Sequence, residues 1–266
     1  MFMNIYLCRE EIFSSGQSNY AGQALGLLVA ETREAALEAA RHVSVVYGEG
    51  GSVVVDVEAA LEDADRVVPG GYAMQYGDVA GALAGADRVV SGRFKMGSQY
   101  HFHMETQTCL VSPVEDGYDV AVASQDVNMI QAIVSLALAI PANSVNPKVT
   151  RLGGSYGGKI YLPNHLATAA AVAAHKLGRP VRVHLPLEDN MRMLGKRCAF
   201  VFDYKLGLDR EGKILALESD LYSDGGWSVN DVDCFVAALF GQSCYKEKFS
   251  SNIYGLNTNH LMIFFE

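Results

Sequence analysis

Apolar and polar residues follow one another along the chain in patterns that predict short strands and helices. Near the amino terminus, apolar runs at residues 25–30 and 43–47 predict two strands, with a helix between them that begins after Thr32. Glu34 and Glu38 lie early in this helix, where the helix dipole favours negative charge. A β-α-β segment of this kind cannot bury its sheet alone, so we expect it to need a partner.

The pattern becomes clearer further along the chain. Strands are predicted at residues 93–95, 108–112, 118–123, 144–152, 181–185, 200–206 and 214–222, most of which are rich in apolar residues or alternate apolar with polar ones. The last two strands are predicted to form a hairpin, because Asp209-Arg210-Glu211-Gly212 between them is typical of a turn.

Two helices are predicted among these strands. The first covers residues 127–140 and ends before Pro141, and the second covers residues 164–177 and ends at Gly178. Hairpins mixed with crossover helices indicate a fold of the α+β class.

A change of composition near residue 90 suggests a boundary between two domains, residues 1–90 and 91–266. The run Ala-Asp-Arg-Val-Val occurs at residues 64–68 and again at residues 86–90. Two short copies do not indicate a repeat architecture, which needs several units to bury a continuous core.

A glycine-rich run lies between the predicted strand that ends near residue 152 and the second helix. Four of the six residues from Gly153 to Gly158 are glycines. Glycine loses the most backbone entropy on ordering, so such a run is expected where the backbone approaches another group closely. The run therefore predicts either a tight turn or a set of backbone amides that cradle an anion.

The same run nearly matches the nucleotide-binding pattern G-x-x-x-x-G-K-[ST], with Gly153, Gly158 and Lys159 in the required places. The next residue is Ile160, which has no hydroxyl group to hold magnesium. The predicted helix also begins several residues too late for such a loop. Both features argue against ATP or GTP binding.

Composition excludes several other classes of protein. Half of the 266 residues are apolar, and the net charge of −9 argues against nucleic acid as the main partner. No window approaches eighteen uninterrupted apolar residues, so we expect no membrane span. The five cysteines are scattered and odd in number, which argues against a disulfide framework and a metal–thiolate site. These features predict a cytoplasmic protein.

Several motifs keep a common order and spacing. They are Gly97-x-Gln99-x-His101-Phe102-x-Met104-Glu105, Ser124-Gln125, the run from Arg151 to Lys159, Gly178-Arg179-Pro180-Val181-Arg182, Gly195-Lys196-Arg197 and Tyr204-Lys205. Together they resemble the molybdenum hydroxylases, the family of aldehyde oxidases and xanthine dehydrogenases. The resemblance implies an α/β hammerhead-like domain at residues 1–90, lacking its beginning. Residues 91–266 resemble the first part of the molybdenum-cofactor (molybdopterin) domain.

The resemblance also implies a set of site residues. The family holds its molybdenum ion through a pterin dithiolene, so no protein side chain is expected to ligate the metal. Gln125 stands where the family has a glutamine that hydrogen-bonds an oxo ligand, and it is our candidate catalytic residue; without the resemblance it is an ordinary polar residue. Cofactor binding is implied for Gln125 and for five consecutive loop residues, Gly154, Ser155, Tyr156, Gly157 and Gly158.

Ile160 is the expected substrate-pocket residue. Xanthine dehydrogenases carry a glutamate here that orients the purine, whereas aldehyde oxidases carry an apolar residue. Ile160, residues 104–109 and Tyr156 therefore resemble the insect-type aldehyde oxidases. The resemblance implies oxidation of small-molecule aldehydes, and of some N-heterocycles, with oxygen taken from water. Xanthine dehydrogenase stays an alternative.

The pattern His101-x-His103-x-Glu105 suggests a second kind of metal site. Alternate residues of a strand share a face, and these residue types ligate zinc. The family has a histidine at the first position and usually an aromatic residue at the second. We therefore expect packing and hydrogen bonding near the cofactor cleft instead of zinc.

The family enzymes carry further parts that we do not find in this sequence. These are a glutamate general base, two [2Fe–2S] clusters and an FAD domain that passes electrons to oxygen. Residues 260–266 depart from the family pattern, so we expect a truncated gene model. The full-length form is expected to be a homodimer, and the isolated chain to be inactive. The alternative is a truncated, non-catalytic paralogue or a dimerising fragment.

Overall fold

The computed structural model describes residues 2–5, 8–67, 72–194, 196–228 and 248–256. Residues 260–266, Gly195 and two of the five cysteines, Cys234 and Cys244, lie outside this part of the chain. The chain forms two compact units. The first consists mainly of residues 1–52 and 100–196, and the second of residues 53–99 and 197–262.

The first unit is built on a four-stranded sheet with the strand order β7-β6-β5-β8. The strands are β5 (Thr108–Val114), β6 (Gly117–Val122), β7 (Val145–Lys148) and β8 (Val181–His184). Strand β5 is antiparallel to β6 and β8, whereas β6 and β7 are parallel.

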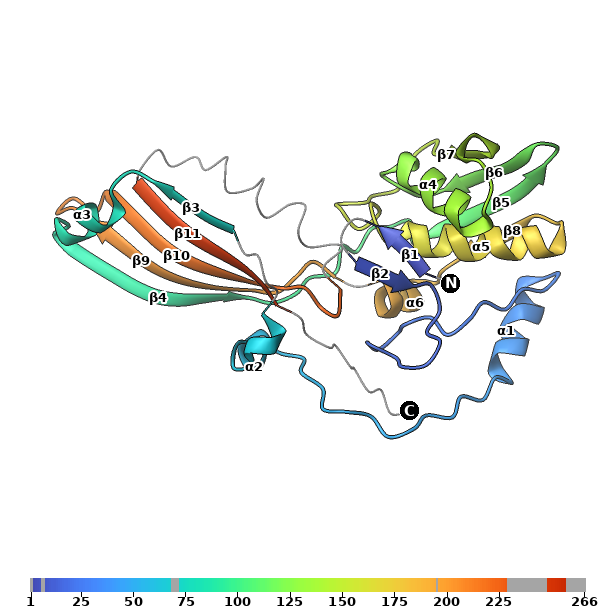
Figure 1. Ribbon diagram of the computed structural model, residues 1–266, viewed down its shortest axis with the longest axis horizontal. Helices are drawn as coiled ribbons and strands as arrows, with labels where there is room; N and C mark the ends of the chain where they lie inside the picture. The colour runs from blue at the N-terminus through green and yellow to red at the C-terminus, as the bar shows by residue number, and fades with distance from the viewer. Residues whose placement is uncertain (1, 6–7, 68–71, 195, 229–247, 257–266) are drawn as a thin grey trace. The chain divides into compact units, whose positions relative to one another are not determined.

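Two helices, α4 (Val127–Leu138) and α5 (Pro163–Leu177), pack against each other and against this sheet (Figure 1). Their apolar faces form the main core with the strands, which includes Val111, Val120, Ile130, Val134, Val145, Ala167, Ala170, Ala171 and Ala174. Alanines on the buried face of α5 allow the helix axis to approach the sheet closely. Helix α5 ends at Gly178 in the left-handed conformation, as predicted.

The connection from β6 through α4 to β7 decides where the candidate site lies. Parallel neighbouring strands end at the same edge of a sheet. Gln125 follows the end of β6, and the glycine run follows the end of β7. The topology therefore brings these two segments to one edge of the sheet.

The first unit also contains short elements outside the main sheet. They are the antiparallel pair β1 (Phe2–Ile5) and β2 (Cys8–Glu11), helix α1 (Arg33–Arg41), the 3-10 helix η2 (Ala142–Ser144) and helix α6 (Leu187–Met193).

The second unit contains a five-stranded sheet with the order β3-β11-β10-β9-β4 (Figure 1). The strands are β3 (Tyr72–Tyr76), β4 (Arg88–Met96), β9 (Phe200–Leu208), β10 (Ile214–Asp224) and β11 (Lys248–Leu256). Strands β9 and β10 form the predicted hairpin, with Gly212 at a φ of 83° in its turn. Helix α3 (Val79–Ala84) and the 3-10 helix η1 (Ala64–Arg66) also belong to this unit.

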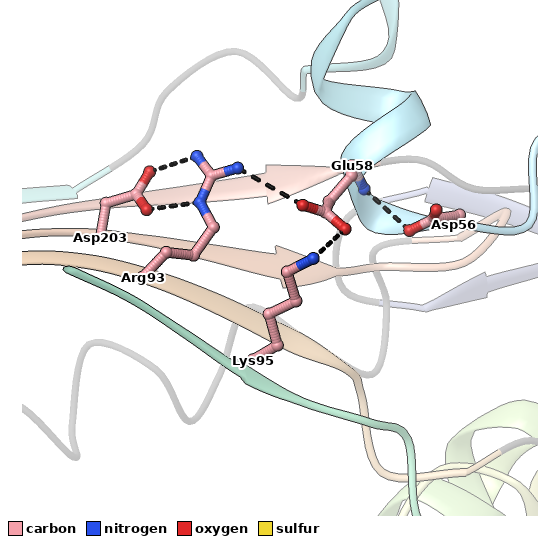
Figure 2. Close-up of polar contacts among 5 residues, drawn as sticks. All are labelled: Asp56, Glu58, Arg93, Lys95 and Asp203. Atoms are coloured by element: carbon pink, nitrogen blue, oxygen red, sulfur yellow. Dashed lines mark hydrogen bonds and ion pairs between the residues drawn. The ribbon is translucent and has the colours of Figure 1, made fainter.

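Helix α2 (Val57–Leu61) is held on this sheet by apolar packing and by ion pairs. Val57 and Ala60 pack with Val201 of strand β9. Glu58 of the helix pairs with Arg93 and Lys95 of strand β4 (Figure 2). Arg93 also forms a bidentate ion pair with Asp203, its cross-strand partner in β9.

The Arg93–Asp203 pair makes a prediction about pH. Hydrogen bonding and charge from Arg93 hold the pKa of Asp203 below its ordinary value of 3.8. The pair therefore stabilises the fold above the unfolded-state pKa, and this contribution is lost as the pH falls through the lower, folded-state pKa. We expect Asp203→Asn to lower the melting temperature by about 2–4 °C at pH 7, and the difference from wild type to shrink as the pH falls below 3.8.

The matched control for this prediction is Glu218→Gln. Glu218 pairs with Lys205 on the neighbouring strand through a single hydrogen bond between exposed side chains. Exposed single-bond pairs contribute little, so this variant should melt close to wild type at every pH. Thermal unfolding followed by circular dichroism measures both variants. Equal melting temperatures for Asp203→Asn and wild type at pH 7 would contradict the assigned role of the pair.

Three predictions of local structure are wrong or too long. Residues 25–30 and 43–47 form no strand, because no second strand lies beside either run in the described part of the chain. The strand predicted at residues 144–152 stops at Lys148, where the chain enters the glycine run. The helix between the two N-terminal runs is confirmed as α1, and the hydroxyl group of Thr32 caps it by accepting from Ala35 N–H.

The domain boundary near residue 90 stays a prediction, and strand β4 runs through this position without a break. Among the described residues, no helix has the length and apolar character that crossing a bilayer requires.

Candidate functional site

The glycine run folds as two overlapping turns. Gly158 N–H donates to the Ser155 carbonyl over 2.8 Å, and Ile160 N–H donates to the Gly157 carbonyl over 3.3 Å. Gly154, Tyr156 and Gly157 have positive φ angles of 92°, 51° and 92°. Glycine adopts such angles without strain, whereas tyrosine does so at a cost of about 1 kcal/mol.

Three of the four glycines pack closely against residues 101–105, and at two of them an added Cβ atom would clash. A Cβ atom added at Gly153 would lie 2.6 Å from the Cβ of Glu105, and one at Gly158 would lie 2.7 Å from the His101 ring. At Gly154 the added atom would lie 3.1 Å from the Cβ of His103. The sequence interpretation assigned the missing side chains to the cofactor, and the structure adds this second reason.

Gly157 is the exception in the run. An added Cβ atom there would meet nothing within 4 Å, so the backbone at this position borders open space. Its φ of 92° still favours glycine over any other residue.

Gln125 is fastened to the loop by its backbone and its side-chain oxygen. Its Oε1 accepts hydrogen bonds from Gly157 N–H and Lys159 N–H, each over 3.2 Å. Its own backbone N–H donates to the Lys159 carbonyl over 2.6 Å. This arrangement fixes the orientation of the side-chain amide. Among the described residues, the Nε2 group finds no acceptor and can donate to a ligand.

Three consecutive backbone donors of the loop are also unused. In the described part of the chain, the N–H groups of Gly154, Ser155 and Tyr156 donate to no protein acceptor. Successive amides in a loop with positive φ angles form a concave site for negatively charged or oxygen-rich groups. The loop and Gln125 therefore fit a ligand that presents several acceptor oxygens.

Lys159 does not serve as a phosphate-binding lysine. Its side chain is 0% exposed, and its Nζ lies 2.7 Å from Oε2 of Glu105. Helix α5 begins only at Pro163, which confirms the late helix start predicted from the sequence. The reasons against a nucleotide-binding loop therefore extend to the position of the lysine itself.

Two residues that the sequence interpretation did not assign to the site hold the loop in place through hydrogen bonds. Gln107 is 1% exposed and donates from Nε2 to the Gly158 carbonyl over 2.9 Å. Glu105 accepts from both Gly153 N–H and Lys159 Nζ through Oε2. The sequence offered a signal only for Glu105, because it and Lys159 are opposite charges beside apolar and glycine-rich runs and therefore need partners. It offered none for Gln107.

The pattern of His101, His103 and Glu105 does not form a strand face. These residues lie in an irregular segment, with Phe102 at a φ of 51°. The two histidine rings are stacked, with their centroids 6.4 Å apart. Burial, together with the charge of Lys159, lowers the pKa of His103. No group of three metal-ligating side chains occurs in the part of the chain that the structure describes.

Ile160 directly follows the buried lysine. It is half-buried, and its N–H closes the second turn of the loop. It stands between the glycine loop and helix α5. Its roles in the substrate pocket, and those of Gln125 and Gly154–Gly158 toward a cofactor, stay predictions.

An α+β unit that presents unused amides and a fixed glutamine at one sheet edge can receive a ligand with several acceptor oxygens. The family model for the molybdopterin cofactor-binding domain matches residues 61–262, so the chain belongs to this family. This match, together with the relatives and the solved structure described next, confirms the resemblance to the aldehyde oxidase and xanthine dehydrogenase family, the α+β fold and the molybdopterin cofactor.

Known proteins of two kinds are similar to the chain. It is 39% identical over 241 residues to a xanthine dehydrogenase of Blastobotrys adeninivorans, covering 89% of this chain and 17% of that protein. It is 35% identical over 241 residues to aldehyde oxidase 3 of Mus musculus, covering 89% of this chain and 18% of that protein. The chain thus spans less than a fifth of the length of these relatives.

A solved structure shows the same fold. The quinoline 2-oxidoreductase of Pseudomonas putida 86 aligns with a TM-score of 0.81 and 24% identity, covering 96% of this chain and 34% of that one. The similarity of the two structures supports the α+β fold of this chain.

Proposed function

We propose that this chain holds the molybdenum–molybdopterin cofactor of an aldehyde oxidase-type enzyme, with Gln125 and the loop residues Gly154, Ser155, Tyr156, Gly157 and Gly158 as its contacts. One observation carries the proposal. Three unpaired loop amides and the free amide of Gln125 lie together after two parallel strands. These donors match the acceptor oxygens that the family's cofactor presents.

When bound, the cofactor supplies the two-electron redox chemistry by which an aldehyde and water become a carboxylic acid. The chain's own residues bind and orient. Gln125 donates from Nε2 while its Oε1 stays fastened to two loop amides. The loop amides donate from a backbone that packing against Glu105 and His101 keeps in place.

The longer protein would provide the remaining parts of the reaction. These are the general base, the FAD and [2Fe–2S] groups that carry electrons to oxygen, and the second subunit of a homodimer. The chain alone should therefore bind the cofactor weakly and turn over no aldehyde. A truncated, non-catalytic product that binds little, or that pairs with a full-length subunit, is the competing function, and it predicts little or no cofactor in the purified chain.

Purification of the chain from a host that makes the cofactor distinguishes these functions. We expect molybdenum and pterin in equal molar amounts, below one per chain, as measured by elemental analysis and by fluorescence of the oxidised pterin. Protein free of both groups would favour the non-catalytic alternative. Turnover of an aldehyde by the chain alone would show that the general base and the FAD and [2Fe–2S] groups of the longer protein are not required.

Ile160 supports aldehydes as the substrate class over purines. An apolar side chain cannot pair with the polar edge of a purine, and a buried polar edge without a partner weakens binding. Since relatives of both kinds match the chain, xanthine oxidation is the competing activity.

We expect Ile160→Glu, introduced into the full-length enzyme, to lower kcat/KM for an apolar aldehyde such as benzaldehyde by about 10- to 100-fold. A carboxylate in an apolar pocket must be desolvated, and it favours substrates that donate hydrogen bonds. Steady-state kinetics with benzaldehyde and xanthine measure the change. Ile160→Val, which keeps the apolar surface, should stay within about threefold of wild type. A wild-type enzyme that prefers xanthine would contradict the assignment.

A further inference from the structure

An ion pair with a fully buried lysine joins the glycine loop to the segment of residues 101–105. Lys159 Nζ lies 2.7 Å from Glu105 Oε2, and the lysine side chain is 0% exposed whereas that of the glutamate is 34% exposed. A charge that is removed from water in this way needs a partner of opposite sign. In the described structure, Glu105 is the acidic side chain that supplies it.

The same carboxylate oxygen holds both ends of the loop. Glu105 Oε2 accepts from the N–H of Gly153, the first glycine, over 3.0 Å, and from the side chain of Lys159, which follows the last glycine. The backbone of Lys159 is in turn bound on both sides by Gln125. A continuous set of contacts therefore leads from Glu105 through Lys159 to the candidate catalytic glutamine.

We propose that Glu105 and Lys159 are positioning residues, whose ion pair holds the glycine loop and Gln125 in the geometry that receives the cofactor. The inference rests on the proposed function for its purpose, but the order of the loop can be measured without any cofactor. Neither side chain is proposed to touch substrate or cofactor.

The unequal burial of the two partners predicts an unequal response to mutation. Glu105→Gln keeps an oxygen that can accept from Gly153, yet it leaves the charge of Lys159 buried without a counter-charge. Lys159→Met removes the buried charge and leaves a carboxylate that is already a third exposed and can be hydrated. Glu105→Gln should therefore disorder the glycine loop more than Lys159→Met does. Adding Lys159→Met to Glu105→Gln should restore part of the order of the loop.

Hydrogen exchange of the full chain tests this ranking of the variants without cofactor. It is measured by mass spectrometry on peptides that cover residues 151–160. We expect Glu105→Gln to speed exchange of the hydrogen-bonded loop amides by about tenfold, Lys159→Met by less than about threefold, and the double variant to return to within about threefold of wild type. Asp119→Asn is the matched control, because it removes a carboxylate from a lysine pair of 2.8 Å in the same unit, between strands β6 and β7. It should leave loop exchange unchanged.

Cofactor content of the same four variants provides the second readout. Glu105→Gln should carry about a tenth of the wild-type molybdenum and pterin, and the double variant should recover most of the loss. If Glu105→Gln exchanges like wild type, or if the double variant is worse than either single variant, the positioning role is wrong. If loop exchange follows the expected order while wild-type protein carries no cofactor, the proposed function fails and the ion pair still orders the loop.

Discussion

Replacing Gly158 by alanine is expected to destabilise the unit that carries the loop by about 2 kcal/mol. The added Cβ would lie 2.7 Å from both Cγ and Nδ1 of the His101 ring, which is too close for any unstrained contact. Gly158 is buried, its N–H closes a loop turn, and its carbonyl accepts from Gln107. The backbone therefore cannot move away from the ring without breaking hydrogen bonds. Urea unfolding followed by circular dichroism measures the effect.

Two other glycines separate the clash from general effects of alanine. At exposed Gly26 the added Cβ meets nothing within 4 Å, so Gly26→Ala should unfold within about 0.5 kcal/mol of wild type. At Gly157 there is also open space, but φ is 92°, so alanine should cost about 1 kcal/mol through backbone strain. A Gly158→Ala protein as stable as Gly26→Ala would show that the close packing on His101 is not maintained in solution.

Changing Gln125 to glutamate should weaken cofactor binding by about 10- to 100-fold while leaving the fold intact. Glutamate keeps an oxygen that can accept from Gly157 N–H and Lys159 N–H, so the loop stays fastened. It loses the Nε2 donor, and it adds a negative charge opposite the acceptor oxygens of the ligand. Molybdenum and pterin content, compared at equal protein concentration, measures the loss, and urea unfolding should match wild type within about 0.5 kcal/mol.

Gln125→Ala extends this comparison. Alanine removes the donor and also the acceptor for two loop amides, so it should lower both cofactor content and loop protection against hydrogen exchange. Exposed Gln17 provides the control, since Gln17→Glu adds the same charge at a residue that forms no hydrogen bond with the loop in the described structure, and it should change neither property. Wild-type cofactor content in Gln125→Glu would remove Gln125 from the proposed site.

Local signals were sufficient wherever one short segment decides its own conformation. The hydroxyl of Thr32 caps α1, Gly178 ends α5 and Gly212 shapes the β9–β10 turn, all as predicted. Each of these features depends on hydrogen bonds or backbone angles within a few residues. Nearby residues are always present at high effective concentration, so the sequence alone specifies such features.

Predictions failed where a conformation depends on a distant partner. Residues 25–30 and 43–47 have strand-like composition, yet a strand requires a neighbour to receive its backbone hydrogen bonds. The repeated run Ala-Asp-Arg-Val-Val makes the same point. Its first copy begins the 3-10 helix η1, Ala64–Arg66, whereas its second copy leads into strand β4 at Arg88. The surrounding sheet, not the five letters, decides between them.

By itself, the sequence determined the α+β class, the family, and the candidate site residues Gln125, Ile160 and the glycine run. The α+β class follows from residue types and spacing, whereas the family and these residues follow from the resemblance, and the roles of the residues stay predictions. Only the tertiary structure decided that Glu105 and Lys159, 54 positions apart, form a buried pair, and that Gln125 Oε1 meets the amide of Gly157. Those contacts depend on the parallel register of β6 and β7 and on how residues 101–105 pack under the loop, and no local pattern encodes either.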